Sequence, residues 1–144
     1  MPMPHQEDNK AYAYFCVEEF SIDPDEITRR IGLQPTTFWR KGDLHPKTRL
    51  ERSMNRWMLH SRLSRDNDLE AHVKDVLAQL DSQKEAFTSL CSEYGGYLQL
   101  VGYFYQYYPG FHLDREDTKR IGEYHLAIDC DFYYLYSEKR EGTA

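Results

Sequence analysis

The sequence predicts one α+β domain: a four-stranded, mainly antiparallel sheet with helices on one face, a variant of the ferredoxin-like arrangement. Three observations predict this class. Segments with the composition or alternation of strands take turns with segments of helical periodicity. The expected helices begin at aspartate caps or end at glycines. The length of 144 residues is that of a single domain with one hydrophobic core.

The first half of the chain contains two expected strands and one short helix. Residues 11–20 are rich in aromatic and β-branched side chains and form the first strand. Asp23 is a natural N-cap with Pro24 at the first helical position, and Gly32 ends this helix. Residues 56–63 alternate between apolar and polar side chains, which predicts the second strand.

The second half contains a long helix, a short helix and two further strands. Apolar residues repeat at three and four positions over 69–94, which predicts one continuous helix that Gly95 ends. Residues 97–108 form the third expected strand. A short helix begins at Asp114, and residues 123–136 form the fourth strand. Two strand–helix–strand units are therefore joined by a long central helix.

We expect the ordered core to span about residues 10–136, with flexible ends at 1–9 and 137–144. The first ten residues lack the apolar stretch of a signal peptide. The sequence also lacks any apolar run near the ~20 residues of a membrane helix. We therefore expect a protein without membrane association.

The three cysteines favour a cytoplasmic protein. Cys16, Cys91 and Cys130 are odd in number, widely spaced and surrounded by apolar residues, so we expect buried free thiols. The sequence contains no C-x-x-C pair, and its six histidines have no spacing typical of metal ligands. We therefore expect neither a structural metal nor a cofactor.

Charge is unevenly distributed along the chain. The net charge is −6 and the pI is about 5.5, which argues against general nucleic-acid binding. The segment from Pro35 to Trp57 differs, because it has six Lys or Arg against two Asp or Glu. It carries a net +4, and the rest of the chain carries −10.

This basic segment contains the first candidate site, at residues 37–49. Lys41-Gly42-Asp43 favours a turn, because glycine adopts positive φ and aspartate bonds to nearby amides. If Trp39 anchors the loop in the core, the basic residues surround the turn and can hold a phosphate or carboxylate. The alternative is a loop with a purely structural turn. The candidate ligand-binding residues are Trp39, Arg40, Lys41, Asp43 and Lys47.

The second candidate site is the sheet face opposite the helices. Alternation in the expected strands gives this face many tyrosines, together with arginines and aspartates. Tyrosine and arginine are enriched in protein interfaces, although an ordinary solvated face has a similar composition. Two aspartates on the last strand would repel the phosphates of RNA. The candidate partner-binding residues are Arg62, Tyr103, Tyr105, Tyr107, Asp129 and Asp131.

The sequence provides little support for catalysis. Asp129 and Asp131 share a strand face, so with His125 they can be drawn as a cation site or an acid–base pair. Two ordinary surface acids have the same spacing. The chain has no phosphate-binding glycine loop and no G-x-S-x-G motif. We therefore assign no catalytic residue.

The order of motifs resembles that of one protein family. A first strand, the run IGLQPT, the Lys41-Gly42-Asp43 turn, W-x-L-x-S from Trp57 to Ser61 and a long helix follow one another. This order is similar to an uncharacterised bacterial family, domain of unknown function four-two-seven-nine, over roughly residues 10–136. The resemblance implies a small, soluble, stand-alone bacterial α+β protein, and it supplies no catalytic residues.

Three functions remain open from the sequence. The first is a non-enzymatic interaction module that binds a protein partner or a second copy of itself, similar in general character to bacterial immunity proteins. The second is a small-ligand or anion-binding domain that uses the basic loop. The third is an enzyme built around Asp129 and Asp131.

Overall fold

The computed structural model of the protein describes residues 7–135, which form five strands and four helices. Residues 1–6 and 136–144, which include most of the ends expected to be flexible, lie outside the described residues. The strands are β1 (Lys10–Glu18), β2 (Thr37–Trp39), β3 (Arg56–His60), β4 (Tyr97–Phe104) and β5 (Ala127–Tyr134). The helices are α1 (Pro24–Ile31), α2 (Leu69–Asp81), α3 (Lys84–Tyr94) and α4 (Arg115–Glu123).

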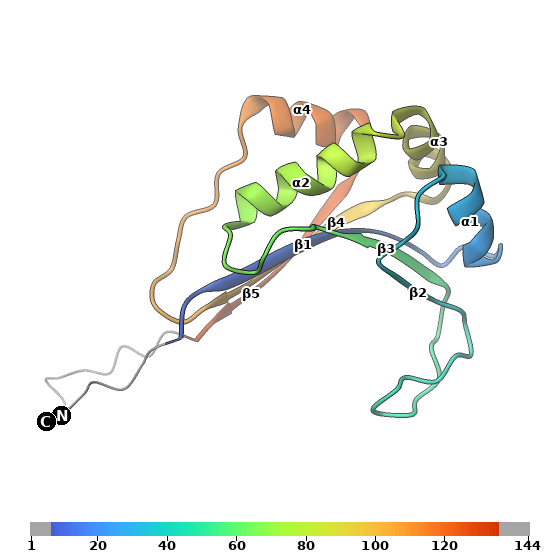
Figure 1. Ribbon diagram of the computed structural model, residues 1–144, viewed down its shortest axis with the longest axis horizontal. Helices are drawn as coiled ribbons and strands as arrows, with labels where there is room; N and C mark the ends of the chain where they lie inside the picture. The colour runs from blue at the N-terminus through green and yellow to red at the C-terminus, as the bar shows by residue number, and fades with distance from the viewer. Residues whose placement is uncertain (1–6, 136–144) are drawn as a thin grey trace, which may run out of the picture.

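The five strands form one mixed sheet in the order β2-β3-β1-β4-β5, and the four helices lie on one of its faces (Figure 1). Neighbouring strands are antiparallel except β4 and β5, which are parallel. The α+β class is confirmed. The expected sheet of four strands is wrong in strand number, because β2 adds a fifth strand. The pairing is mainly antiparallel as expected, and the parallel pair of β4 and β5 is where the sheet departs from the expected ferredoxin-like variant.

The helical connections explain the mixed sheet. A strand that is reached through a crossover helix runs parallel to the strand before that helix. This holds for β4 and β5, which α4 connects. It also holds for β1 and β2, which α1 connects, because each is antiparallel to β3 between them. Both strand–helix–strand units are therefore parallel crossovers.

The expected single helix over 69–94 is two helices. The chain leaves α2 at Ser82, whose hydroxyl donates to the carbonyl oxygen of Gln79 at 2.6 Å. Gln83 then takes a non-helical backbone conformation, with φ −136° and ψ 51°. Residues 81–85 are all exposed, so no apolar contact holds a continuous helix at this point. The break turns α3 toward α1, which it contacts.

All four expected strands end earlier than the sequence indicated, and the last one also begins later. β3 ends at His60, because the next residues turn to the helix side, where the backbone N–H of Arg62 donates to Asp75 of α2 at 2.8 Å. β4 ends at Phe104, ahead of the segment that contains Pro109. Residues 123–126 finish α4 and its connection, so β5 begins only at Ala127.

The predicted helix caps are confirmed. The Asp23 side chain accepts from the backbone N–H of Asp25 at 2.9 Å, and Pro24 begins α1. Gly32 ends α1 in the left-handed region at φ 81°. Asp114 caps α4 by accepting from the backbone N–H of Asp117 at 2.8 Å.

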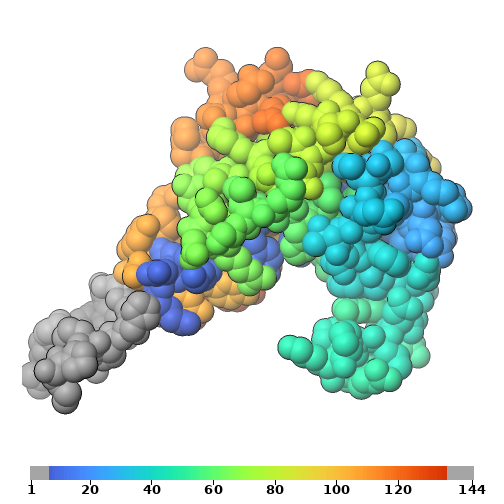
Figure 2. Space-filling view, in the orientation of Figure 1, coloured from blue at the N-terminus to red at the C-terminus, as the bar shows by residue number. Residues whose placement is uncertain are grey.

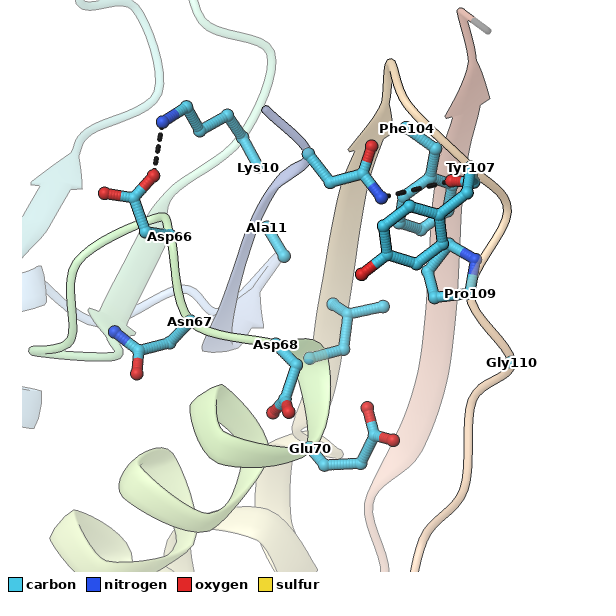
Figure 3. A pocket seen from close by; sticks show the side chains of 12 residues that line it. Lys10, Ala11, Asp66, Asn67, Asp68, Glu70, Phe104, Tyr107, Pro109 and Gly110 are labelled. Atoms are coloured by element: carbon cyan, nitrogen blue, oxygen red, sulfur yellow. Dashed lines mark hydrogen bonds and ion pairs between the residues drawn. The ribbon is translucent and has the colours of Figure 1, made fainter. Parts of the chain in front are cut away.

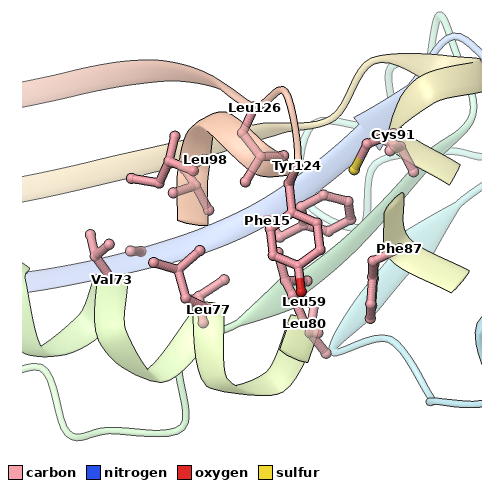
Figure 4. Close-up of a cluster of buried hydrophobic side chains, with 14 of the residues drawn as sticks. Phe15, Leu59, Val73, Leu77, Leu80, Phe87, Cys91, Leu98, Tyr124 and Leu126 are labelled. Carbon is pink, nitrogen blue, oxygen red and sulfur yellow. The ribbon is translucent and has the colours of Figure 1, made fainter. Parts of the chain in front are cut away.

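The hydrophobic core lies between the sheet and the helix layer (Figure 4). Phe15 is fully buried and makes edge-on contacts with Trp57 and Phe87, with ring centroids 6.3 Å and 5.3 Å away. These residues come from β1, β3 and α3, so their contacts join three distant parts of the chain. None of the helices within 7–135 has the length and apolar character to cross a membrane.

The expectation of three buried thiols is correct for Cys16 and Cys91 and wrong for Cys130. Cys130 is exposed because β5 is an edge strand that the helix layer leaves largely uncovered. Ile128, which points to the same side, is also exposed at 41%. The apolar sequence of β5 therefore does not indicate burial.

Candidate functional site

The candidate site lies on the sheet face opposite the helices, which we call the open face (Figure 1). Side chains alternate along each strand, so every second residue points to this face. Cross-strand register then shows which residues are neighbours. The open face consists of Thr37 and Trp39 of β2; Arg56, Met58 and His60 of β3; Lys10, Tyr12, Tyr14, Cys16 and Glu18 of β1; Tyr97, Gln99, Val101 and Tyr103 of β4; and Ala127, Asp129, Asp131 and Tyr133 of β5.

Three aromatic rings are stacked in the middle of the open face. The three rings pack against one another: the His60 centroid lies 4.6 Å from that of Tyr14 and 6.0 Å from that of Tyr12, and the two tyrosine centroids lie 6.3 Å apart. The guanidinium of Arg65 lies 4.3 Å from the Tyr12 centroid and extends the stack at one end. Burial lowers the pKa of His60, and the charges of Arg65 and Arg56 lower it further. The ring is therefore neutral at neutral pH, which suits it to stacking.

Two further arginines extend this stack toward β2. Arg56 lies 5.9 Å from the Tyr14 centroid and 5.4 Å from the ring of Trp39. Its guanidinium donates to the Tyr97 hydroxyl at 2.6 Å and pairs with Glu18 at 3.1 Å, so it is fixed in place. We call the array the aromatic–cation band; its members are Arg65, Tyr12, His60, Tyr14, Arg56, Trp39 and Arg52.

Arg52 is the member of the band best placed to bind a partner. Its guanidinium lies 3.6 Å from the centroid of the Trp39 ring, which is only partly buried. Unlike the guanidinium of Arg56, that of Arg52 has no hydrogen bond or ion pair with the residues the structure describes. Stacking on an aromatic face holds a guanidinium in place and leaves its N–H edge free. Arg52 therefore offers a pre-oriented donor for a carboxylate or phosphate.

Residues 40–55 form an arm that projects beyond the open face (Figures 1 and 2). Paired backbone bonds hold it as a narrow hairpin: the N–H of Gly42 donates to the carbonyl of Arg52 at 2.8 Å, and the N–H of Arg52 to Asp43 at 2.7 Å. At its tip, Nδ1 of His45 accepts from the N–H groups of Lys47 and Thr48.

Asn55 fixes the base of the arm. Its side-chain oxygen accepts from the backbone N–H of Lys41 at 2.8 Å, and its amide nitrogen donates to the carbonyls of Phe20 and Ile22. One side chain therefore ties both strands of the arm to the segment between β1 and α1. This anchorage sets the direction in which the arm leaves the sheet.

A hollow of about 390 Å³ lies where the arm meets the open face. Its lining includes Trp39, Arg52 and Arg56, with Glu18 and Tyr97 on the sheet side. Figure 2 shows the larger concavity between the arm and the rest of the molecule. The hollow therefore combines aromatic surface with two arginines and two glutamates, Glu18 and Glu51. Aromatic residues and arginine are the ones typical of an interface anchor.

The opposite side of the open face is acidic. Asp129 and Asp131 are exposed on β5, and Oδ2 of Asp131 accepts from the side-chain amide of Gln99 at 3.0 Å. Tyr103 and Tyr133 stack beside them with centroids 5.0 Å apart. The face thus has a basic half, with Arg52, Arg56 and Arg65, and an acidic half, with Asp129 and Asp131.

The structure separates the basic residues of the predicted loop site. Arg40 pairs with Asp23 and Asp25 at 2.8 Å and 3.0 Å, and this bond lowers the pKa of Asp23 to about 2. Lys41, at the base of the arm, and Lys47, near its tip, are exposed and have no ion pair within residues 7–135. The two lysines and Arg40 therefore do not form one anion-binding site.

The other two predicted loop residues have structural positions. The Asp43 carboxylate accepts from the backbone N–H of Arg40 at 2.8 Å and so stabilises the turn. Gly42 adopts φ 92°, as the turn requires. The expectation that Trp39 anchors the loop in the core is wrong, because Trp39 points to the open face and Trp57 occupies the core.

The predicted partner-binding residues divide into two groups. Tyr103, Asp129 and Asp131 lie on the open face, whereas Tyr105 and Tyr107 follow the end of β4. Arg62 does not lie on the open face either. It follows β3 and pairs with Asp75 of α2 at 2.7 Å, which makes it part of the contact between sheet and helices.

Sequence reasoning missed Tyr12, Tyr14, Arg52 and Arg65 as members of the site. The first two were detectable, because the run AYAY at 11–14 alternates small and large side chains and so places both tyrosines on one face. The two arginines come from connecting segments. Their contacts with Trp39 and Tyr12 depend on tertiary folding that no local pattern reports.

The structure gives the acidic residues no metal-binding arrangement. Between residues 7 and 135, no group of three or more His, Cys, Asp or Glu side chains is arranged to hold a metal ion. His125 is exposed, with φ 55°, and precedes β5. Asp129 and Asp131 remain as two surface carboxylates on one strand.

A second cavity, of about 220 Å³, lies near the start of β1 (Figure 3). Several of its polar residues have structural partners: Lys10 pairs with Asp66, and Asp68 caps α2 by accepting from the N–H of Ala71 at 2.8 Å. Asn9 donates to the carbonyl of Tyr107 at 3.1 Å. These contacts join β1, the segment before α2 and the segment after β4.

Comparison with known proteins places the chain in a family. The family model described as "Domain of unknown function (DUF4279)" matches residues 9–135. The chain belongs to the DUF4279 family. The match covers all five strands and all four helices of this DUF4279 protein, together with the arm. No curated protein and no solved structure matches the chain.

Proposed function

We propose that this DUF4279 protein is a non-enzymatic module that binds another protein on its open face. The observation that carries the proposal is the aromatic–cation band, which crosses a sheet face without a covering helix. Tyrosine, tryptophan and arginine are the residues most enriched at the energetic centres of protein interfaces. The band brings these residue types together from β1, β2, β3 and two connecting segments.

The charge of the band specifies the chemistry of the partner. Three arginines lie along the band, and Glu18 is paired with one of them. Arg52 presents unpaired donors at the hollow beside the arm. A fitting partner therefore carries carboxylates that reach Arg52, surrounded by apolar or aromatic surface that covers Trp39 and the tyrosines.

Site-specific photo-crosslinking in the cells that encode the protein tests this proposal. A photoreactive phenylalanine replaces Tyr133 on the open face, and in a matched control it replaces Lys119, exposed on α4. We expect discrete adducts with a protein from the open-face position and none from α4. Equal labelling from both positions, or no adduct from either, would contradict the proposal.

Substitutions at the hollow provide a quantitative readout once the adduct identifies the partner. Arg52→Ala and Trp39→Ala are expected to weaken binding about 30-fold each, because truncating a central interface residue costs about 2 kcal/mol or more. Lys119→Ala is the control and is expected to bind as the wild type does. Unchanged affinity in folded Arg52→Ala would remove the band from the interface.

A second candidate function is supported by the same hollow. The Arg52 guanidinium has no ion pair among the described side chains, and the hollow of about 390 Å³ that it lines admits a small anion. Thermal unfolding with phosphate, nucleotides and dicarboxylates tests this alternative. A ligand at about a hundred times its dissociation constant stabilises a protein by ~2.7 kcal/mol. Such a shift, absent in folded Arg52→Ala, would favour a small-ligand site over a protein partner.

A further inference from the structure

We propose that the partner on the open face is a second copy of this chain, bound face to face about a two-fold axis. The inference rests on the proposed function, since it names the partner of the same surface. The observation behind it is the division of the open face into a basic half and an acidic half. A surface that carries both charges on opposite sides is complementary to itself after rotation.

The strand order gives the symmetry that such a dimer needs. β1 is the central strand, with β3 and β2 on one side and β4 and β5 on the other. A two-fold axis in the interface, parallel to β1, places β5 of each copy over the β2 side of the other. Each copy then brings its acidic half over the basic half of the other. On β1 itself, Lys10 and Glu18 of each copy face the same residues of the other, and each is paired within its own copy, with Asp66 and Arg56.

Register adds a specific contact to this arrangement. In the sheet register, Asp131 of β5 lies beside Val101 of β4, and Val101 lies beside Tyr12 of β1. The Arg65 guanidinium lies over the ring of Tyr12. Rotation about this axis leaves the position of a residue along the strand direction unchanged. Asp131 of each copy therefore lies at the same height along the strands as Arg65 of the other copy. The tyrosines of the two central strands meet between these charged contacts. Two twisted sheets pack in this way at about 30°.

The size of the open face suits a reversible dimer. Five strands about 4.8 Å apart and about 22 Å long give a footprint of roughly 500 Å² per copy. This lies below the range of stable specific interfaces, which bury about 600–1,000 Å² on each partner, and in the range of weak, transient ones. The arm stands beside the face and adds to the contact area (Figure 2). We therefore expect dissociation in the micromolar range.

Sedimentation velocity of the full chain tests the dimer. Between about 1 µM and about 200 µM the wild type is expected to shift from monomer to dimer, as an interface of this size predicts. The variant Asp129→Lys/Asp131→Lys makes both halves basic, and Arg52→Glu/Arg65→Glu makes both acidic. Each variant alone is expected to stay monomeric. Lys119→Glu, a charge reversal on α4, is expected to dimerise as the wild type does.

Mixing the two variants tests the charge complementarity itself. In a mixed pair the unchanged basic half faces the unchanged acidic half, and the two reversed halves also attract. An equimolar mixture is therefore expected to restore a heterodimer at the concentration where the wild type dimerises. Circular dichroism of each variant confirms folding. Dimerisation of either reversed variant alone, or a mixture that stays monomeric, would overturn the proposal.

The outcomes separate this inference from the proposed function. If the wild type is monomeric at every concentration, the dimer is wrong. In that case a crosslink from Tyr133 to a different protein still supports binding on the open face. If the wild type is monomeric and Tyr133 yields no adduct, both are wrong.

Discussion

His72 shows how one buried side chain makes stability depend on pH. It is fully buried in α2, where Nδ1 lies 2.7 Å from the hydroxyl oxygen of Ser61. Burial lowers its pKa below the ordinary value of 6.5, because the charged imidazolium loses its hydration. The folded protein thus holds His72 neutral under conditions in which the unfolded chain begins to bind a proton.

The sign of the pH effect follows from this shift. Above about pH 6.5 both states are neutral at His72, and stability does not depend on its protonation. Below this pH the unfolded state binds the proton first, so stability falls. We expect the melting temperature to decrease from about pH 7.5 to about pH 5, and to decrease less in His72→Gln. His125→Gln, at an exposed histidine, is the control and should retain the full wild-type decrease. An equal pH dependence in wild type and His72→Gln would contradict this account.

Gly96 is a position where an added methyl group has no space. A Cβ there would lie 2.6 Å from Cε1 of Phe15 and 3.0 Å from Sγ of Cys91. Gly96→Ala is therefore expected to destabilise the protein by about 1–3 kcal/mol through overpacking. Gly122→Ala is the matched control in α4, where a Cβ meets no atom within 4 Å. It should be neutral or stabilise by up to about 1 kcal/mol, because alanine favours the helix. Denaturant unfolding measures both; equal effects would contradict the steric argument.

Among the elements, those with local signals were predictable and those set by tertiary contacts were not. The caps at Asp23 and Asp114 were identified because their hydrogen bonds join residues two or three positions apart. β2 was missed because three residues are too few to show alternation. The parallel direction of β5 depends on where α4 packs on the sheet. The residues of β5 themselves carry no signal for this position.

The candidate site was predictable to a similar extent. The tyrosine-rich face followed from alternation, and Tyr103, Asp129 and Asp131 were placed on it correctly. The loop residues were grouped by proximity in sequence, whereas the hairpin puts Arg40 at its base and Lys47 near its tip. Arg40 forms ion pairs with Asp23 and Asp25 at the start of α1. The charge count of the segment does not reveal a pairing between residues so far apart in the sequence.

The arm is an element whose direction depends on one side chain. Asn55→Ala removes three hydrogen bonds, to Lys41, Phe20 and Ile22. We expect the free energy of unfolding to fall by about 1–3 kcal/mol, because partly buried groups lose their partners. Hydrogen exchange should accelerate over 40–55 and not in α2 or α4. Asn67→Ala, before α2, is the control, because the Asn67 side chain donates a single hydrogen bond within residues 7–135, to the carbonyl of Ser64. Unchanged exchange in the arm of Asn55→Ala would contradict the assigned role.

Across the whole molecule, the two faces of the sheet differ in what they contribute. The helix face buries the large core residues, and the open face carries polar and aromatic side chains. This asymmetry separates stability from binding. Substitutions at exposed positions of the open face can therefore test recognition with little effect on folding, and substitutions in the core have the opposite effect.

We expect the described residues to unfold as one cooperative unit. Phe87 joins α3 to the sheet through contacts with Phe15 and Trp57, so Phe87→Ala is expected to cost about 3–5 kcal/mol. The loss should appear equally in far-ultraviolet circular dichroism and in tryptophan fluorescence, since Trp57 is buried in the same core. Tyr133→Ala, at an exposed position, is the control and should change stability by less than about 1 kcal/mol. Separate transitions for the two probes would show two folding units.

The central position of β1 has a consequence for the order in which the protein assembles. β1 is the first strand of this sheet to be synthesised, yet its neighbours β3 and β4 begin at Arg56 and Tyr97. Pairings so distant in sequence fold slowly, because a large loop must close before each contact forms. Until β4 is synthesised, β1 lacks the neighbouring strand on one of its two edges. The nascent chain therefore exposes its most buried strand for longest, and this strand is where we expect a chaperone to bind first.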